Sequence, residues 1–84
     1  MDTIELIKTS DANLATTLLT LGFTIEGTDT TANKTTFYFI QNDQLTQSID
    51  RYWRGELLVD PKSFGAYRRE IMTRIHAQNT QELQ

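Results

Sequence analysis

The chain has 84 residues, a net charge of −3 and no cysteine, and 38% of its residues are hydrophobic. This length predicts one domain with enough apolar residues for a core, and the absence of cysteine excludes disulfides, thiolate metal sites and cysteine nucleophiles. No apolar segment approaches the roughly 20 residues that span a bilayer, and the acidic start lacks the basic and apolar regions of a signal peptide. We therefore expect a cytoplasmic protein without membrane contact, as a monomer or a homodimer.

The first predicted elements are a strand and a helix. Residues 3–8 alternate as a strand does, with Ile4 and Leu6 on one face and Ile7 on the other. Ser10 or Asp11 can cap a helix, whose apolar stripe comprises Leu14, Ala15, Leu18, Leu19 and Leu21. The threonines of this helix fall away from the stripe and are expected to face solvent, namely Thr16, Thr17 and Thr20. Gly22 is the type of residue that ends a helix in a left-handed conformation.

Two strands follow, over residues 23–27 and 35–40, and the chain between them is predicted to turn at Ala32-Asn33. In the second strand Phe37 and Phe39 point to one face of the sheet, while Tyr38 and Ile40 point to the other. Both faces of this strand are therefore apolar, unlike those of a sheet with one solvated face. Either both faces are covered, or one of them docks a partner.

A second helix is predicted to begin at Asp43. Its apolar positions recur at helical spacing, so we expect these side chains to be buried or half-buried: Leu45, Ile49, Tyr52 and Trp53. Arg51 and Arg54 fall on the opposite side of the same helix. Gly55 is expected to end it.

The remaining chain is predicted to form a short edge strand over residues 56–59 and a final helix. Asp60-Pro61 is typical of a helix start, with a capping side chain followed by proline at the first helical position. This helix should reach about Ala77, and Gly65 near its start suggests a close backbone approach. Residues 1–78 would then form the compact domain and residues 79–84 a frayed polar tail.

These elements predict an α+β fold of the order β-α-β-β-α-(β)-α. Its sheet would be small and antiparallel, of the split β-α-β type, with two helices on one face. The C-terminal helix is then available to cover the other face, which would account for the two apolar faces of residues 35–40.

Three stretches of the sequence, KTSDANLATTLLTLGF, TFYF and LTQSIDRYWRGELLVDPKSF, resemble domain-of-unknown-function family 5659, which comprises short prokaryotic and phage-associated proteins. The resemblance covers most of the chain and rests on caps and core positions: Lys8, Thr9, Asp11, Ala15, Leu18, Gly22, Phe23, Phe37, Phe39, Leu45, Ile49, Tyr52, Val59, Asp60, Pro61 and Phe64. It implies a bacterial, archaeal or viral source, including mobile elements. It supplies no function and no catalytic residues.

The sequence contains few of the residues that catalytic sites use. The one histidine, His76, falls near the end of the last predicted helix, where a cation is favoured by the helix dipole. With no cysteine and one histidine, the chain has no set of nitrogen and sulfur ligands for a metal. The four glycines are scattered and form no phosphate-binding loop. We expect no enzyme, no metal and no cofactor.

Basic residues are concentrated in the second half of the chain, since residues 1–50 carry a balance of −5 and residues 51–84 a balance of +2. The exposed cations expected there form a basic rim of Arg51, Arg54, Lys62, Arg69 and Arg74. Arg68 falls within the apolar stripe of the last helix, where its stem can pack while its head reaches water or a carboxylate. A placed guanidinium for a phosphate or a partner's carboxylate is the alternative. The candidate binding surface is the rim with Arg68 and Tyr67.

Two functions fit these observations. The first is a small non-enzymatic protein-binding module, an accessory or inhibitor of a larger machine, using spare apolar surface near Ile7, Tyr38 and residues 56–59. The second is a nucleic-acid-binding accessory protein that uses the basic rim with Tyr67 or Trp53. The net negative charge favours a protein partner over nucleic acid. The stretch KTTFYF is weakly similar to a base-stacking strand of an RNA-recognition sheet, but core packing of its rings is favoured.

Overall fold

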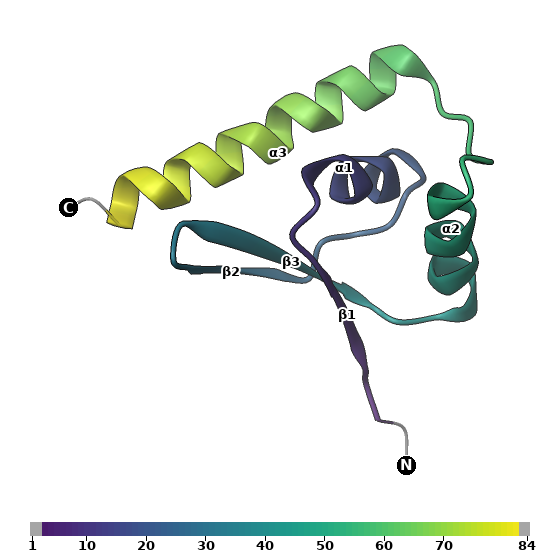
Figure 1. The fold of residues 1–84 in the computed structure, drawn as a ribbon, viewed down its shortest axis with the longest axis horizontal. Coiled ribbons are helices and arrows are strands. Elements are labelled where there is room, and N and C mark those ends of the chain that lie inside the picture. The colour runs from purple at the N-terminus through teal and green to yellow at the C-terminus, as the bar shows by residue number, and fades with distance from the viewer. Residues whose placement is uncertain (1–2, 83–84) are drawn as a thin grey trace.

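The computed structural model describes residues 3–82 of the chain, and side-chain burial for residues 3–77. Three helices and a small antiparallel sheet form an α+β fold, which confirms the predicted class (Figure 1). In chain order the elements are β1 (Leu6–Thr9), α1 (Ala12–Thr20), β2 (Gly27–Thr31), β3 (Lys34–Ile40), α2 (Asp43–Trp53) and α3 (Pro61–Glu82).

The sheet has the strand order β1-β3-β2, and both outer strands run antiparallel to β3. Thr31 pairs with Lys34, and Ala32 and Asn33 between them have φ angles of 53° and 65°. Two consecutive positive φ angles are typical of a two-residue type I′ hairpin turn, so the predicted turn is confirmed. The strand predicted before it was misplaced, because β2 spans Gly27–Thr31 and residues 23–26 lie outside the ladder.

Helix α1 begins and ends at the predicted residues. The Asp11 side chain accepts a hydrogen bond from the Leu14 amide at 3.0 Å, which satisfies one of the free N–H groups of the first turn. At the other end Gly22 has φ of +102°, and the Phe23 amide donates to the Leu18 carbonyl. The local chemistry of both ends is sufficient to fix the length of this helix.

The threonines of α1 correct the expectation that they face solvent. Thr16 is fully buried and Thr17 nearly so, because α3 packs on α1 from the side away from the sheet (Figure 1). Their hydroxyls donate to the carbonyls four residues earlier, Thr16 to Ala12 at 2.7 Å and Thr17 to Asn13 at 2.8 Å. A threonine can thus be buried without an unsatisfied polar group, which makes α1 the central helix of the fold.

Helix α2 is capped by Asn42, whose side chain accepts from the Leu45 amide at 2.8 Å, and the chain leaves it through Gly55 at φ +70°. Leu45 is buried and Tyr52 half-buried, as predicted. Trp53 is 64% exposed, so its expected burial was wrong. Trp53 is the last residue of α2, so its ring extends beyond the end of the helix into solvent and does not pack between α2 and another element.

The connection from α2 to α3 contains no strand within residues 56–59, and Leu58 is 95% exposed. Asp60 caps α3 as predicted, accepting from the Ser63 amide at 2.8 Å. The helix continues to Glu82, beyond the predicted end at Ala77. Nothing lies within 4 Å of a Cβ built at Gly65, so the expected close backbone approach was also wrong. Residues 83–84 of the proposed tail lie outside the described residues.

The core lies on one face of the sheet only. Its buried members come from both α1 and β3 and from one residue each of α2 and α3: Leu14, Ala15, Leu18, Phe37, Phe39, Leu45 and Ile71. Since α3 packs mainly on α1, on the same side of the sheet as the core, the expectation that it covers the opposite sheet face was wrong (Figure 1). Among residues 3–82, no helix is both long and apolar enough to cross a bilayer.

Candidate functional site

The sheet face opposite the helices is the first candidate surface, and we call it the outer face. Directly paired residues of an antiparallel ladder share one face, so the register of β3 with its neighbours defines this surface: Leu6, Lys8, Gly27, Asp29, Thr31, Lys34, Thr36, Tyr38 and Ile40. Ile4 precedes β1 and continues the same alternation. The register of the strands is therefore sufficient to identify the residues of the outer face.

The outer face is apolar at the end nearest the start of β1. There Ile4 is 72% exposed, Leu6 47% and Ile40 41%, and Leu6 pairs directly with Ile40. Tyr38 extends this strip and is half-buried, with the Lys8 ammonium 5.9 Å from the centre of its ring. Such a distance allows a favourable cation–π contact. Four contiguous apolar side chains thus remain in contact with water.

The apolar surface expected near Ile7 is placed differently. Ile7 pairs with Phe39 and packs against the core, while Leu6, which the alternation put on the opposite face, is the exposed residue. The alternation itself was correctly predicted. The error was the assignment of the C-terminal helix to the wrong face.

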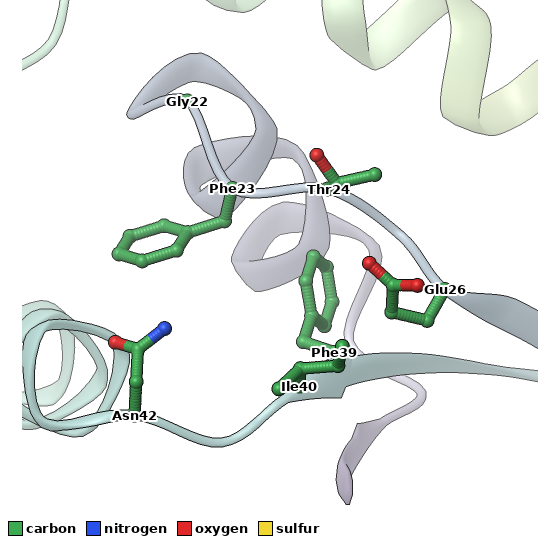
Figure 2. Close-up of a pocket in the computed structure, with 7 residues that line it drawn as sticks. All are labelled: Gly22, Phe23, Thr24, Glu26, Phe39, Ile40 and Asn42. Carbon is green, nitrogen blue, oxygen red and sulfur yellow. The ribbon is translucent and has the colours of Figure 1, made fainter.

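A cavity of about 300 Å³ opens beside the outer face, and we call it the edge groove. It is lined by Gly22, Phe23, Thr24, Glu26, Phe39, Ile40 and Asn42. The loop of residues 22–26 forms one side, and the end of β3 with the start of α2 forms the other (Figure 2). The groove exists because this loop leaves the sheet where β2 would otherwise have continued along β3.

The walls of the edge groove combine two rings with a few polar groups. The side chains of Phe23 and Phe39 lie on either side of the open space, and Phe39 is itself part of the core (Figure 2). Asn42 uses its Oδ1 to cap α2, which leaves its amide nitrogen directed toward the groove. Glu26 is the one charged residue of the lining and is exposed. The groove therefore has an apolar wall and an acidic character.

The edge groove was not predicted from the sequence. The turn at Ala32-Asn33 fixes the register of β2 with β3 but not the residue at which the pairing ends, and residues 23–26 lie outside the ladder. The apolar alternation of Phe23 and Ile25 resembles a strand but instead anchors a loop, since both pack against the core.

The basic rim does not form one continuous surface. Arg54 pairs with Asp50 at 2.7 Å and lies 3.7 Å from Glu56, so local carboxylates balance its charge. On α3 each residue advances by about 100° around the helix axis. Lys62 and Arg69 therefore share one side of the helix, and Tyr67 and Arg74 share another side roughly 140° away. The structure thus divides the predicted cations among separate sides of two helices.

Arg68 and Tyr67 lie where the helical stripe predicts. Arg68 is half-buried, which agrees with a stem that packs on the core, and it makes no ion pair within the described part of the chain. Tyr67 is 40% exposed at the edge of the same stripe, and Arg51 is exposed on α2. None of these residues lines the edge groove.

Titratable groups give little indication of catalysis. The pKa of Tyr52 is raised, mainly by burial of the phenol and secondarily by the negative charge of Asp11. The pKa of Asp60 is lowered, chiefly by the hydrogen bond from the Ser63 amide. Both shifts follow from packing and capping. Among the described residues no three acidic, histidine or cysteine side chains gather as a metal site would require, and His76 is exposed.

Comparison with known families gives one match. A family model described as "Domain of unknown function (DUF5659)" matches residues 4–77. The chain belongs to this family, as the resemblance in its caps and core positions indicated. No curated protein and no solved structure matches the chain significantly.

Proposed function

We propose that this chain is a small non-enzymatic protein-binding module whose main contact surface is the outer face of the sheet. The observation that supports it most directly is the exposed apolar strip of Ile4, Leu6, Tyr38 and Ile40 on a face that no helix covers. Single exposed apolar residues are ordinary on protein surfaces. A contiguous strip with a polar surround is typical of a surface that binds another protein.

The chemistry of the whole chain agrees with a protein partner. The net charge of −3 opposes association with phosphate backbones. The polar half of the outer face carries Lys8, Lys34 and Asp29, so charges of both signs can contribute to specificity at the rim of an interface. The family resemblance implies a prokaryotic or phage-associated setting, and we therefore propose the role of a cytoplasmic accessory or inhibitor of a larger machine.

The experiment is affinity purification of the tagged full chain from its native host, with and without nuclease. The test variant is Leu6→Gln on the outer face, and the matched control is Leu58→Gln, because Leu58 is even more exposed but lies away from the sheet. We expect a nuclease-resistant partner that is retained by the control and lost from Leu6→Gln, with both variants melting close to the parent. A partner retained equally by both variants would contradict the proposed surface.

One observation favours nucleic acid as the alternative. Trp53 is 64% exposed, so its ring could stack on a base, and Arg51 and Arg54 lie within two residues of it in the sequence, although they fall on the other side of α2. The ion pair of Arg54 with Asp50 weakens this alternative, because one of the two flanking cations is already neutralised. The salt dependence of oligonucleotide binding distinguishes the two functions.

A further inference from the structure

We propose that the edge groove binds a short extended peptide segment of a partner, with an apolar side chain between Phe23 and Ile40 and a basic residue at Glu26. This inference rests on the proposed protein-binding function and names the chemistry of one contact. It is carried by three observations: open backbone groups of β3, the apolar walls of the groove and its acidic charge.

The first observation is a short free edge of β3. The Gln41 amide donates to the Glu5 carbonyl on the β1 side, and the Glu26 amide donates to the Tyr38 carbonyl on the β2 side. Backbone groups of an antiparallel strand alternate between its two sides, so the N–H and C=O of Ile40 point to the β2 side. No backbone hydrogen bond joins Ile40 to the loop of residues 22–26 within the described chain. A peptide strand can therefore pair at Ile40.

The second observation is the size and lining of the groove. Its volume of about 300 Å³ lies at the lower limit of pockets that enclose small ligands. It is bounded by Phe23, Phe39 and Ile40, which offer an apolar environment to one side chain of the peptide (Figure 2). The Asn42 amide nitrogen adds a donor for a peptide carbonyl. Backbone pairing with a side-chain pocket beside it is the usual combination in strand addition to a sheet edge.

The third observation is charge. Glu26 is the charged residue of the lining, and Asp43 follows Asn42 in the first turn of α2. Residues 1–50, which contain the whole groove, carry a balance of −5. A lysine or arginine beside the apolar anchor of the peptide complements this charge, whereas an acidic neighbour would be repelled. Ile40 belongs to both the groove and the outer face, so the two surfaces are continuous.

The test uses a displayed library of random dodecapeptides selected on the immobilised full chain. We expect enriched sequences to place an apolar residue close to lysine or arginine. Glu26→Lys should shift the selected charge from basic to acidic, and Glu70→Lys, an equal charge reversal on α3, should leave it unchanged. For a single enriched peptide, the loss in affinity on Glu26→Lys should be at least about two- to fivefold, the range of an exposed ion pair.

Strand pairing is tested on the same peptide. Methylation of one backbone nitrogen at a time should weaken binding about tenfold at the position that donates to Ile40, and much less at the next residue. Backbone amide shifts of the labelled protein should be largest in residues 22–26 and 40–42. Selection of no sequence, or selection unaffected by Glu26→Lys, would overturn the groove proposal.

Failure of this proposal is distinguishable from failure of the proposed function. Peptide-induced amide shifts confined to Leu6, Lys8 and Tyr38 would overturn the groove as the peptide site while supporting the outer face. Loss of the native partner in Leu6→Gln tests the outer face without any peptide. Each surface thus has its own readout.

Discussion

The rings of Tyr52 and Trp53 meet edge to face, with centroids 4.9 Å apart and an interplanar angle of 84°. Tyr52 is half-buried between α2 and the core, whereas Trp53 is 64% exposed. The tryptophan therefore contacts the protein through its neighbour instead of filling the interior. Aromatic pairs in this geometry contribute about 0.5–1.5 kcal/mol beyond their area burial.

Replacing Trp53 by alanine should consequently destabilise the protein by only about 1 kcal/mol, because most of the ring is already in water. Replacing Leu45, which is fully buried, should cost about 2–5 kcal/mol through the cavity it leaves. Thermal or urea unfolding of both variants measures the difference. A Trp53→Ala variant as unstable as Leu45→Ala would show that the ring is buried in solution.

Thr16 provides a test of the close packing of α3 on α1. Thr16→Val keeps the shape and removes a hydroxyl that bonds to the Ala12 carbonyl. That carbonyl also accepts a helical hydrogen bond, so we expect a change within about 1 kcal/mol. Thr16→Leu adds volume at a fully buried position and should cost about 1–3 kcal/mol. Equal stability of the leucine variant and the parent would contradict this packing.

Much of the local structure could be predicted from the sequence, because caps and turns depend on residues that are neighbours in the chain. Asp11, Gly22, Gly55 and Asp60 lie at the helix ends where their chemistry places them. The turn at Ala32-Asn33 was found for the same reason. Each of these positions is fixed by backbone conformation or by a hydrogen bond within a few residues.

The arrangement of the elements could not be predicted in the same way. Burial of Thr16 and exposure of Ile40 both follow from where α3 packs, which is a contact between distant parts of the chain. The periodicity of α3 shows that it has an apolar side but does not say which surface that side covers. The edge groove depends on the departure of residues 23–26 from the sheet, so it too was missed.

Replacement by alanine should have opposite effects on stability at Gly65 and at Gly55. Gly65 lies in α3 with nothing within 4 Å of an added Cβ, so Gly65→Ala should stabilise the protein by about 1 kcal/mol through helix propensity. Gly55 has φ of +70°, a conformation that alanine adopts with strain, so Gly55→Ala should destabilise it by roughly 1 kcal/mol. Unfolding experiments on the two variants give the signs directly. A destabilising Gly65→Ala would indicate a neighbour that packs against this side of α3.

The stability of α3 should depend on pH through Asp60. Hydrogen bonds from the amide and then from the side chain of Ser63 hold the pKa of the Asp60 carboxyl below the ordinary value of 3.8. Because the folded-state pKa is lowered, the stabilising contribution is present above about pH 4 and is lost as the pH falls through the folded-state pKa. The gap in unfolding free energy between the parent and Asp60→Ala should therefore shrink in acid. A gap that stays constant in acid would show that the charge of the cap contributes nothing.

The final prediction concerns nucleic acid, and it separates the two proposed functions. The cations of the basic rim lie on different sides of α2 and α3, and Arg54 is paired with Asp50. The rim can therefore neutralise about three phosphates at once, and duplex affinity would fall with salt at a slope near −0.9 for each phosphate. We expect no measurable DNA or RNA binding in the low micromolar range at physiological salt.

Fluorescence anisotropy with single-stranded and duplex oligonucleotides at two salt concentrations measures this binding. The test variant changes Arg51 and Arg54 to glutamine, and Lys34→Gln in the hairpin serves as a charge control away from Trp53. Weak binding that responds equally to both variants reflects general electrostatics and leaves the protein-binding proposal in place. Tight, salt-sensitive binding that is lost in the double variant and retained in Lys34→Gln would instead establish Arg51 and Arg54 as phosphate contacts of a nucleic-acid surface, because general electrostatics would respond to both variants.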